Sequence, residues 1–156
     1  MRARYPDVED VVVRDGVRIG YEVYGSGAPT ILLPTSNPIV HARQWKAQVP
    51  FLARHFRVVV VDGRGNGRSD RPVGPAAYAV EEDVADLVAV LDATGTDRVM
   101  VVGTSLGARR GLALAAACCS SPHRSGSATP GATSPSPTSC ASGIPTSRSP
   151  GWRSIP

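Results

Sequence analysis

One short stretch of this chain combines the residue types of a covalent catalyst. Residues 98–102 are mainly apolar and predict a buried strand, which runs into Gly103-Thr104-Ser105-Leu106-Gly107 and then into a predicted helix. A serine at the apex of a sharp strand-to-helix turn is typical of a nucleophile elbow, which exposes the hydroxyl above the sheet. So short a pattern also arises by chance, but the flanking strand and helix favour the elbow. The pattern therefore predicts Ser105 as a nucleophile, beside helix N–H groups that favour negative charge.

Alternating strand and helix patterns surround this motif. Residues 11–13 and 17–24 predict a hairpin around Asp15-Gly16. Further strands are predicted at residues 29–33 and 56–61, and helices at residues 44–55, 80–94 and 106–117, with Pro50 limiting the regularity of the first helix. The alternation predicts an α/β fold in which helices flank a mainly parallel sheet. The acids Glu81, Glu82 and Asp83 fall in a first helical turn, where the helix dipole favours them.

The composition divides the chain into three parts. Residues 1–9 are expected to be a flexible N-terminus, residues 10–117 a partial α/β domain, and residues 118–156 a low-complexity tail. The tail has 11 Ser and 7 Pro in 39 positions and no acidic residue, a composition typical of disorder. It is either a natural disordered tail or the product of a shifted reading frame. Its cysteines, Cys118, Cys119 and Cys140, lack the spacing of a zinc site, so we expect neither a metal nor a cofactor.

Charge and hydropathy exclude several classes of partner. The net charge is +4, but all 13 acids lie at or before Asp97, and the six arginines from Arg98 onward account for the excess. The positive charge is thus no patch on a folded domain, and nucleic-acid binding is not expected. No apolar run of about 18 residues predicts a membrane span, and residues 1–10 do not resemble a signal peptide. We expect a cytoplasmic protein, and nothing in the sequence indicates its oligomeric state.

A second motif, combined with the first, carries a family resemblance. The run Asp62-Gly63-Arg64-Gly65-Asn66-Gly67-Arg68-Ser69-Asp70 follows a predicted strand and precedes the helix that leads to the elbow. Together the two motifs resemble the amino-terminal half of the α/β-hydrolase superfamily, over about residues 10–117. The resemblance implies an eight-stranded, mostly parallel sheet and a triad in the order Ser, acid, His. The glycine run lacks a phosphate-loop lysine, so Arg64 and Asp70 are expected to hold this loop structurally.

The resemblance also implies two backbone N–H donors for an oxyanion, which by position are those of Leu106 and Ser36. Family members usually have His-Gly after the strand that ends here in Leu32-Leu33, whereas this chain has Pro34-Thr35-Ser36-Asn37-Pro38. Some members, such as enol-lactone hydrolases, also lack His-Gly. Asn37 is the next choice as a donor. The nearby His41 is either a substrate-pocket residue or, as we favour, a surface loop residue.

The triad acid and histidine are not recognisable in this sequence. Only 51 residues follow Ser105, they include no acid, and His123 is their one histidine. Without the later strands, residues 99–102 are expected to lie at an edge of the sheet. Two hypotheses follow. The chain is a truncated serine hydrolase acting through Ser105 on a small-molecule ester, lactone or related acyl substrate, or it is a catalytically inactive fragment with no independent function.

Overall fold

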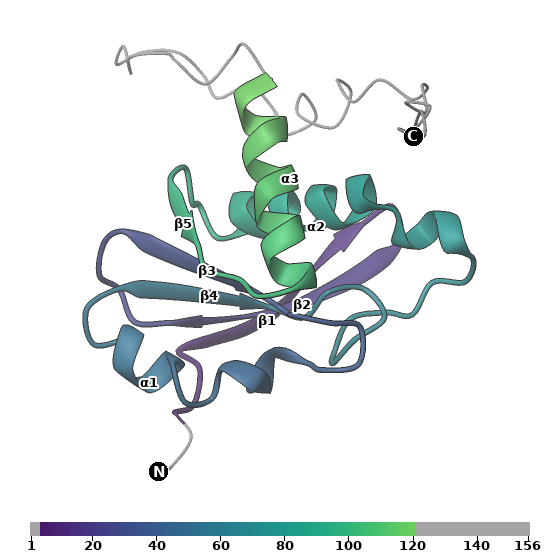
Figure 1. Ribbon diagram of the computed structural model, residues 1–156. Coiled ribbons are helices and arrows are strands. Elements are labelled where there is room, and N and C mark those ends of the chain that lie inside the picture. Colours follow the sequence, from purple (N-terminus) through teal and green to yellow (C-terminus); the bar gives the residue numbers. More distant parts are fainter. Residues whose placement is uncertain (1–3, 121–156) are drawn as a thin grey trace, which may run out of the picture.

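A computed structural model describes residues 4–120 of the chain as a five-stranded sheet with helices on both faces (Figure 1). The strands are β1 (Val8–Arg14), β2 (Val17–Tyr24), β3 (Thr30–Pro34), β4 (Arg57–Val61) and β5 (Val99–Val101), in the spatial order β1-β2-β4-β3-β5. The pairs β1–β2 and β2–β4 are antiparallel, and β4–β3 and β3–β5 are parallel. The described sheet is therefore mixed, and its parallel half carries the elbow.

The predicted hairpin forms, and its first strand is longer than expected. Asp15 and Gly16 both have positive φ, 50° and 79°, as the tight turn between β1 and β2 requires. However, β1 begins at Val8, inside the segment expected to be flexible, because Val8 pairs with Val23 across the hairpin. The backbone N–H of Asp7 also donates to the Val23 carbonyl at 2.8 Å. Pairing with β2 thus orders residues 8 and 9, for which the local sequence alone predicted no strand.

The helices differ from the predictions mainly at their bounds. The helix predicted at residues 44–55 is two short pieces, the 3-10 helix η1 (Ala42–Trp45) and α1 (Val49–Leu52). Pro50 lies in the first turn of α1, where its missing N–H is tolerated, so the proline starts a new helix. After η2 (Pro75–Tyr78), α2 spans Val80–Ala93 as predicted within one residue. The elbow helix α3 spans Leu106–Ser120, three residues beyond its predicted end; the rest of the predicted tail lies outside the described residues.

Alternate residues of the central strands pack into two different cores. In β4, Val59 and Val61 face the core under α2 and α3, and Val58 and Val60 face the core under η1 and α1. This two-residue period is typical of a sheet that is covered on both faces. Figure 1 shows α2 and α3 on one side of the sheet and α1 on the other. The sheet thus forms the middle layer of three.

The strand that leads into the elbow lies at an edge of the described sheet, as predicted. β5 pairs only with β3, and Met100 keeps 54% of its surface exposed. On α3, Leu112 is 75% exposed whereas Leu114 is buried against α2 and the sheet. No helix within residues 4–120 is long and apolar enough to cross a membrane.

Candidate active site

The turn between β5 and α3 has the backbone geometry of an elbow. Ser105 has φ of 52°, one of two non-glycine residues in the described chain with positive φ. This left-handed conformation is sterically costly for a residue with a Cβ, and such strain is commonly found at functional sites. Ser105 is exposed, and its hydroxyl makes no hydrogen bond to any residue within 4–120. The chain therefore presents a free hydroxyl at the amino end of α3.

The two glycines of the motif are needed for close packing of the backbone. A Cβ on Gly103 would lie 2.6 Å from the carbonyl carbon of Gly107, closer than real Cβ contacts. A Cβ on Gly107 would lie 3.1 Å from the carbonyl oxygens of both Pro34 and Thr35. The first glycine lets the turn close, and the second lets α3 approach the end of β3. The pattern thus has a steric cause at both positions.

The segment after β3 brings the predicted oxyanion residues together in an unexpected orientation. The N–H of Leu106 donates to the Ser36 carbonyl at 3.0 Å. The Gln44 side-chain amide, oriented to satisfy its neighbours, accepts the Ser36 N–H at Oε1, at 2.9 Å. Sequence reasoning placed Ser36 and Leu106 side by side, but it expected both N–H groups to be available. In this structure each has a partner within the chain.

The loop after β4 fixes the outer side of this segment. Asn66 donates through Nδ2 to the Asn37 carbonyl at 3.1 Å and to the Val40 carbonyl at 2.7 Å. Asp62 accepts the Ala42 N–H at 2.6 Å. The elbow, the segment after β3 and this loop all follow the carboxyl ends of neighbouring parallel strands, where ligands bind in open α/β sheets.

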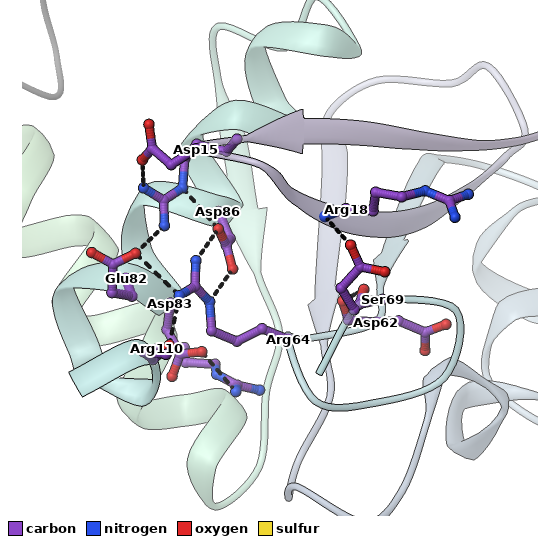
Figure 2. Close-up of polar contacts among 12 residues, drawn as sticks. Asp15, Arg18, Asp62, Arg64, Ser69, Glu82, Asp83, Asp86 and Arg110 are labelled. Atoms are coloured by element: carbon purple, nitrogen blue, oxygen red, sulfur yellow. Dashed lines mark hydrogen bonds and ion pairs between the residues drawn. The ribbon is translucent and has the colours of Figure 1, made fainter. Parts of the chain in front are cut away.

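A buried ion pair fixes the other side of the segment after β3. Arg110 of α3 donates to Asp83 Oδ1 of α2 at 2.8 Å and to the Thr35 carbonyl and hydroxyl oxygens at 3.2 and 3.1 Å. The side chains of Arg110 and Asp83 are each only 6% exposed. The elbow helix is thereby joined both to α2 and to the residue before Ser36. Figure 2 shows this pair beside a larger cluster of charges on α2.

Comparisons with known proteins identify the family. Residues 29–129, more than half of the chain, match the family model described as the alpha/beta hydrolase fold. This chain belongs to the α/β-hydrolase family. The match continues past Ala117, where the composition changes, into residues that the structure does not describe.

Hydrolases with different substrates resemble this α/β-hydrolase chain. It is 38% identical over 110 residues to a 2-hydroxy-6-oxo-2,4-heptadienoate hydrolase of Pseudomonas putida, covering 70% of this chain and 40% of that protein. It is 38% identical over 102 residues to epoxide hydrolase A of Mycobacterium tuberculosis, covering 64% and 31%. The enol-lactonase structure from Burkholderia xenovorans LB400 superposes with a TM-score of 0.62 at 32% identity, covering 69% and 41%. The chain thus spans less than half the length of these relatives.

A network of charges supports the loop after β4 of this α/β-hydrolase chain. The sequence predicted a structural role for Arg64 and Asp70 in this loop. Arg64 is buried and pairs with both carboxylate oxygens of Asp86, at 2.7 and 2.8 Å, and with Glu82 at 3.1 Å. Arg14 of β1 contacts the same two acids. Asp70 accepts the Arg18 N–H at 2.9 Å. The structural role expected of Arg64 and Asp70 is confirmed.

The network shifts the pKa values of Arg14, Arg64 and Glu82. The hydrogen bond from Arg14, opposed by partial burial and reinforced by the charges of Arg14 and Arg64, lowers the pKa of Glu82 below its ordinary value of 4.5. The hydrogen bond to Asp86 outweighs the effect of burial and raises the pKa of Arg64. The acids of the first turn of α2 were assigned to the helix dipole, but Glu82 and Asp83 have arginine partners as well. Arg14 and Arg64 thus favour the ionised form of Glu82.

The two histidines considered in the sequence, His41 and His123, are not brought to the elbow by the described structure. His41 is exposed and its Nδ1 accepts the Arg43 N–H at 3.3 Å, capping η1, which agrees with a surface loop residue. His123 lies outside the described residues. Within residues 4–120, no group of three or more His, Cys, Asp and Glu side chains could hold a metal ion. Nor does any described group accept the proton of Ser105.

A separate cavity lies on the opposite face of the sheet. It has a volume of about 500 Å³ and is lined by Tyr24, Trp45 and Val49, which belong to the core under η1 and α1, and by several charged residues. Ser105 is not among its lining residues. The elbow, rather than this cavity, remains the candidate active site, because the exposed Ser105 with its left-handed backbone lies there.

Sequence reasoning missed Gln44, Asp83 and Arg110 as residues that arrange the site. One signal was available for Arg110. It is a charged residue in a helix rich in alanine and glycine, and these small residues indicate that the helix packs closely. A long cationic side chain in such a helix needs a partner when it is buried. For Gln44 and Asp83 nothing in the local pattern indicated a role.

Proposed function

We propose that this chain carries the nucleophile part of a serine hydrolase that acts on an ester, lactone or related small acyl substrate. The observation that carries the proposal is the exposed Ser105 at φ of 52° at the amino end of α3, on a glycine-framed turn. Its Oγ would attack the acyl carbon, and N–H groups at the elbow would stabilise the resulting oxyanion. A serine at this position argues against epoxide hydrolysis, for which family members use an aspartate. A cytoplasmic location belongs to this proposal.

The proton of the Ser105 hydroxyl needs a base that residues 4–120 do not provide. Serine is a weak nucleophile unless a neighbouring group accepts its proton. In the proposed reaction a histidine from outside the described residues takes that proton and later delivers it to the leaving group. The second candidate, an inactive fragment, is supported by the absence of such a base among residues 4–120.

A fluorophosphonate probe separates the two candidates. We expect the purified full chain to be labelled covalently, and labelling to disappear in Ser105→Ala. Ser26→Ala is the matched control, since Ser26 is an exposed serine beyond the amino end of β3, away from the elbow, and its variant should be labelled like the wild type. If the folded wild-type chain is not labelled, the fragment hypothesis replaces the hydrolase proposal for this chain.

A further inference from the structure

Side-chain hydrogen bonds fix the backbone on both sides of the peptide that joins Ser36 to Asn37. In the peptide before it, Arg110 binds the Thr35 carbonyl at 3.2 Å and Gln44 binds the Ser36 N–H at 2.9 Å. In the peptide after it, Asn66 binds the Asn37 carbonyl at 3.1 Å. The flanking peptides are therefore fixed by three side chains from η1, α3 and the loop after β4.

The peptide between them, which joins Ser36 to Asn37, makes one hydrogen bond. Its carbonyl oxygen accepts the Leu106 N–H at 3.0 Å. An elbow N–H would bind the oxyanion of a tetrahedral intermediate at the same distance, so the Ser36 oxygen takes up a hydrogen bond that the oxyanion needs. The carbonyl and N–H of a trans peptide point in opposite directions. The Asn37 N–H accordingly points away from Leu106, and it donates to no atom of the described residues.

We infer that the candidate oxyanion hole opens when the Ser36–Asn37 peptide turns over, so that the Asn37 N–H replaces the Ser36 carbonyl beside the Leu106 N–H. This inference rests on the proposed function and replaces Ser36 with Asn37 as the second donor. The rotation changes ψ of Ser36 and φ of Asn37 and leaves the contacts of Arg110, Gln44 and Asn66 in place. It converts a site filled by its own acceptor into one with two converging donors.

Steric strain explains why the closed form is the resting form. The φ of Asn37 is not positive in this structure, and turning the peptide over takes φ to positive values. Any residue with a Cβ is strained there, whereas glycine is not. A bound oxyanion favours the open form because it bonds to both N–H groups, and it shifts the population by its preference for that form.

Two variants of Asn37 isolate the rotation. Asn37→Gly and Asn37→Ala both lose the side-chain bond from the Ile39 N–H to Asn37 Oδ1, but only glycine removes the strain of positive φ. We expect hydrogen exchange of the Leu106 amide to be faster in Asn37→Gly than in Asn37→Ala by roughly fivefold to a hundredfold. Equal exchange rates in the two folded variants would overturn the inference.

The wild-type chain provides a measurement that needs no variant. A scalar coupling across the hydrogen bond, between the Leu106 amide nitrogen and the Ser36 carbonyl carbon, is expected in the NMR spectrum of the full chain. It should persist in Asn37→Ala and weaken in Asn37→Gly. Its absence from the folded wild type would overturn the closed form even if neither variant folds.

The fluorophosphonate adduct distinguishes this inference from the proposed function. In a labelled chain, the phosphonyl oxygen should shift the Asn37 amide proton downfield and leave the Ser36 amide unchanged. A shift of Ser36 instead of Asn37 would contradict the choice of donor. If Ser105 is not labelled, the proposed function fails, whereas the coupling and exchange measurements still decide whether the peptide turns over.

Discussion

At the scale of single residues, Arg110 joins three parts of the fold beside the elbow: α3, α2 and the end of β3. Its guanidinium reaches Asp83 on α2 and two oxygens of Thr35, all with little exposure to solvent. Its Nε is the buried side-chain polar atom that lacks a partner within the described residues. A buried ion pair is weak evidence for stability, because desolvation of both charges opposes their attraction. The contact with Thr35 indicates that Arg110 serves to place the segment before Ser36.

We expect that removing one partner of the Arg110–Asp83 pair destabilises the fold strongly, and that replacing both partners destabilises it much less. Arg110→Leu leaves the buried Asp83 carboxylate unpaired and should lower the free energy of unfolding by about 3–5 kcal/mol. The double variant Arg110→Leu with Asp83→Leu removes both charges and should recover most of that loss. Urea denaturation of the three proteins measures the difference. A double variant as unstable as Arg110→Leu would mean that the Thr35 contacts, rather than the charge pair, carry the effect.

At the scale of elements, the strand-turn-helix unit depends on the absence of a side chain at Gly103. The Cβ of an alanine there would meet the backbone of Gly107, which cannot move without displacing the start of α3. A Cβ on Gly111, one turn after Gly107 in α3, would meet only the side chain of Val101, at 2.8 Å from Cγ1 and 3.5 Å from Cβ. A side chain can change its rotamer, whereas the backbone of the elbow cannot. The two glycines of this region are therefore not equivalent.

Alanine at these two positions tests the difference. Gly103→Ala is expected to destabilise the chain by about 2–3 kcal/mol and to disturb the Ser105 turn. Gly111→Ala, the matched control, should change stability by about 1 kcal/mol or less, because the helix preference of alanine offsets the displacement of Val101. Thermal unfolding followed by circular dichroism gives both values. Equal losses would show that the elbow has more room than its backbone indicates.

At the scale of the whole molecule, one charge network joins distant parts of the fold. Arg14 comes from the hairpin. Arg64 comes from the loop after β4, and Glu82 and Asp86 come from α2 (Figure 2). It ties the antiparallel half of the sheet to the helix that packs against α3. The loop that supports the segment after β3 is thereby anchored to the core.

This network predicts a pH dependence of stability. Because the folded-state pKa of Glu82 is lowered, its contribution is present above its ordinary value of 4.5 and is lost as pH falls through the folded pKa. Glu82→Gln should lower the free energy of unfolding at neutral pH by about 1 kcal/mol or less, since the side chain is 38% exposed and screened by solvent. That difference should shrink as the pH falls below 4.5.

Urea midpoints measured between neutral and acid pH check this prediction. The neighbouring Glu81→Gln is the control, because Glu81 is exposed and forms no ion pair within residues 4–120. Its profile should follow that of the wild type. A Glu82→Gln difference that stays constant down to the lowest pH would indicate that lost packing, rather than lost charge, causes the effect.

The sequence by itself determined the elements and the position of the elbow. The hairpin at Asp15-Gly16, the strand at β4, the helix α2 and the turn at Ser105 all follow from turn chemistry and from the period of apolar residues. These signals are local, since each depends on residues only a few positions apart. Even the break in the helix predicted at residues 44–55 had a local cause in Pro50.

Only the tertiary structure decided how the site is arranged. Arg110 meets Asp83 across 27 positions and Thr35 across 75, so neither contact exists until the sheet has brought α2, α3 and β3 together. The orientation of the Ser36–Asn37 peptide likewise depends on Gln44, Asn66 and Leu106, which reach it from three other elements. The local sequence predicts which residue, Ser105, stands at the apex of the elbow. Contacts between distant segments decide that the N–H groups of Leu106 and Ser36 bind partners within the chain.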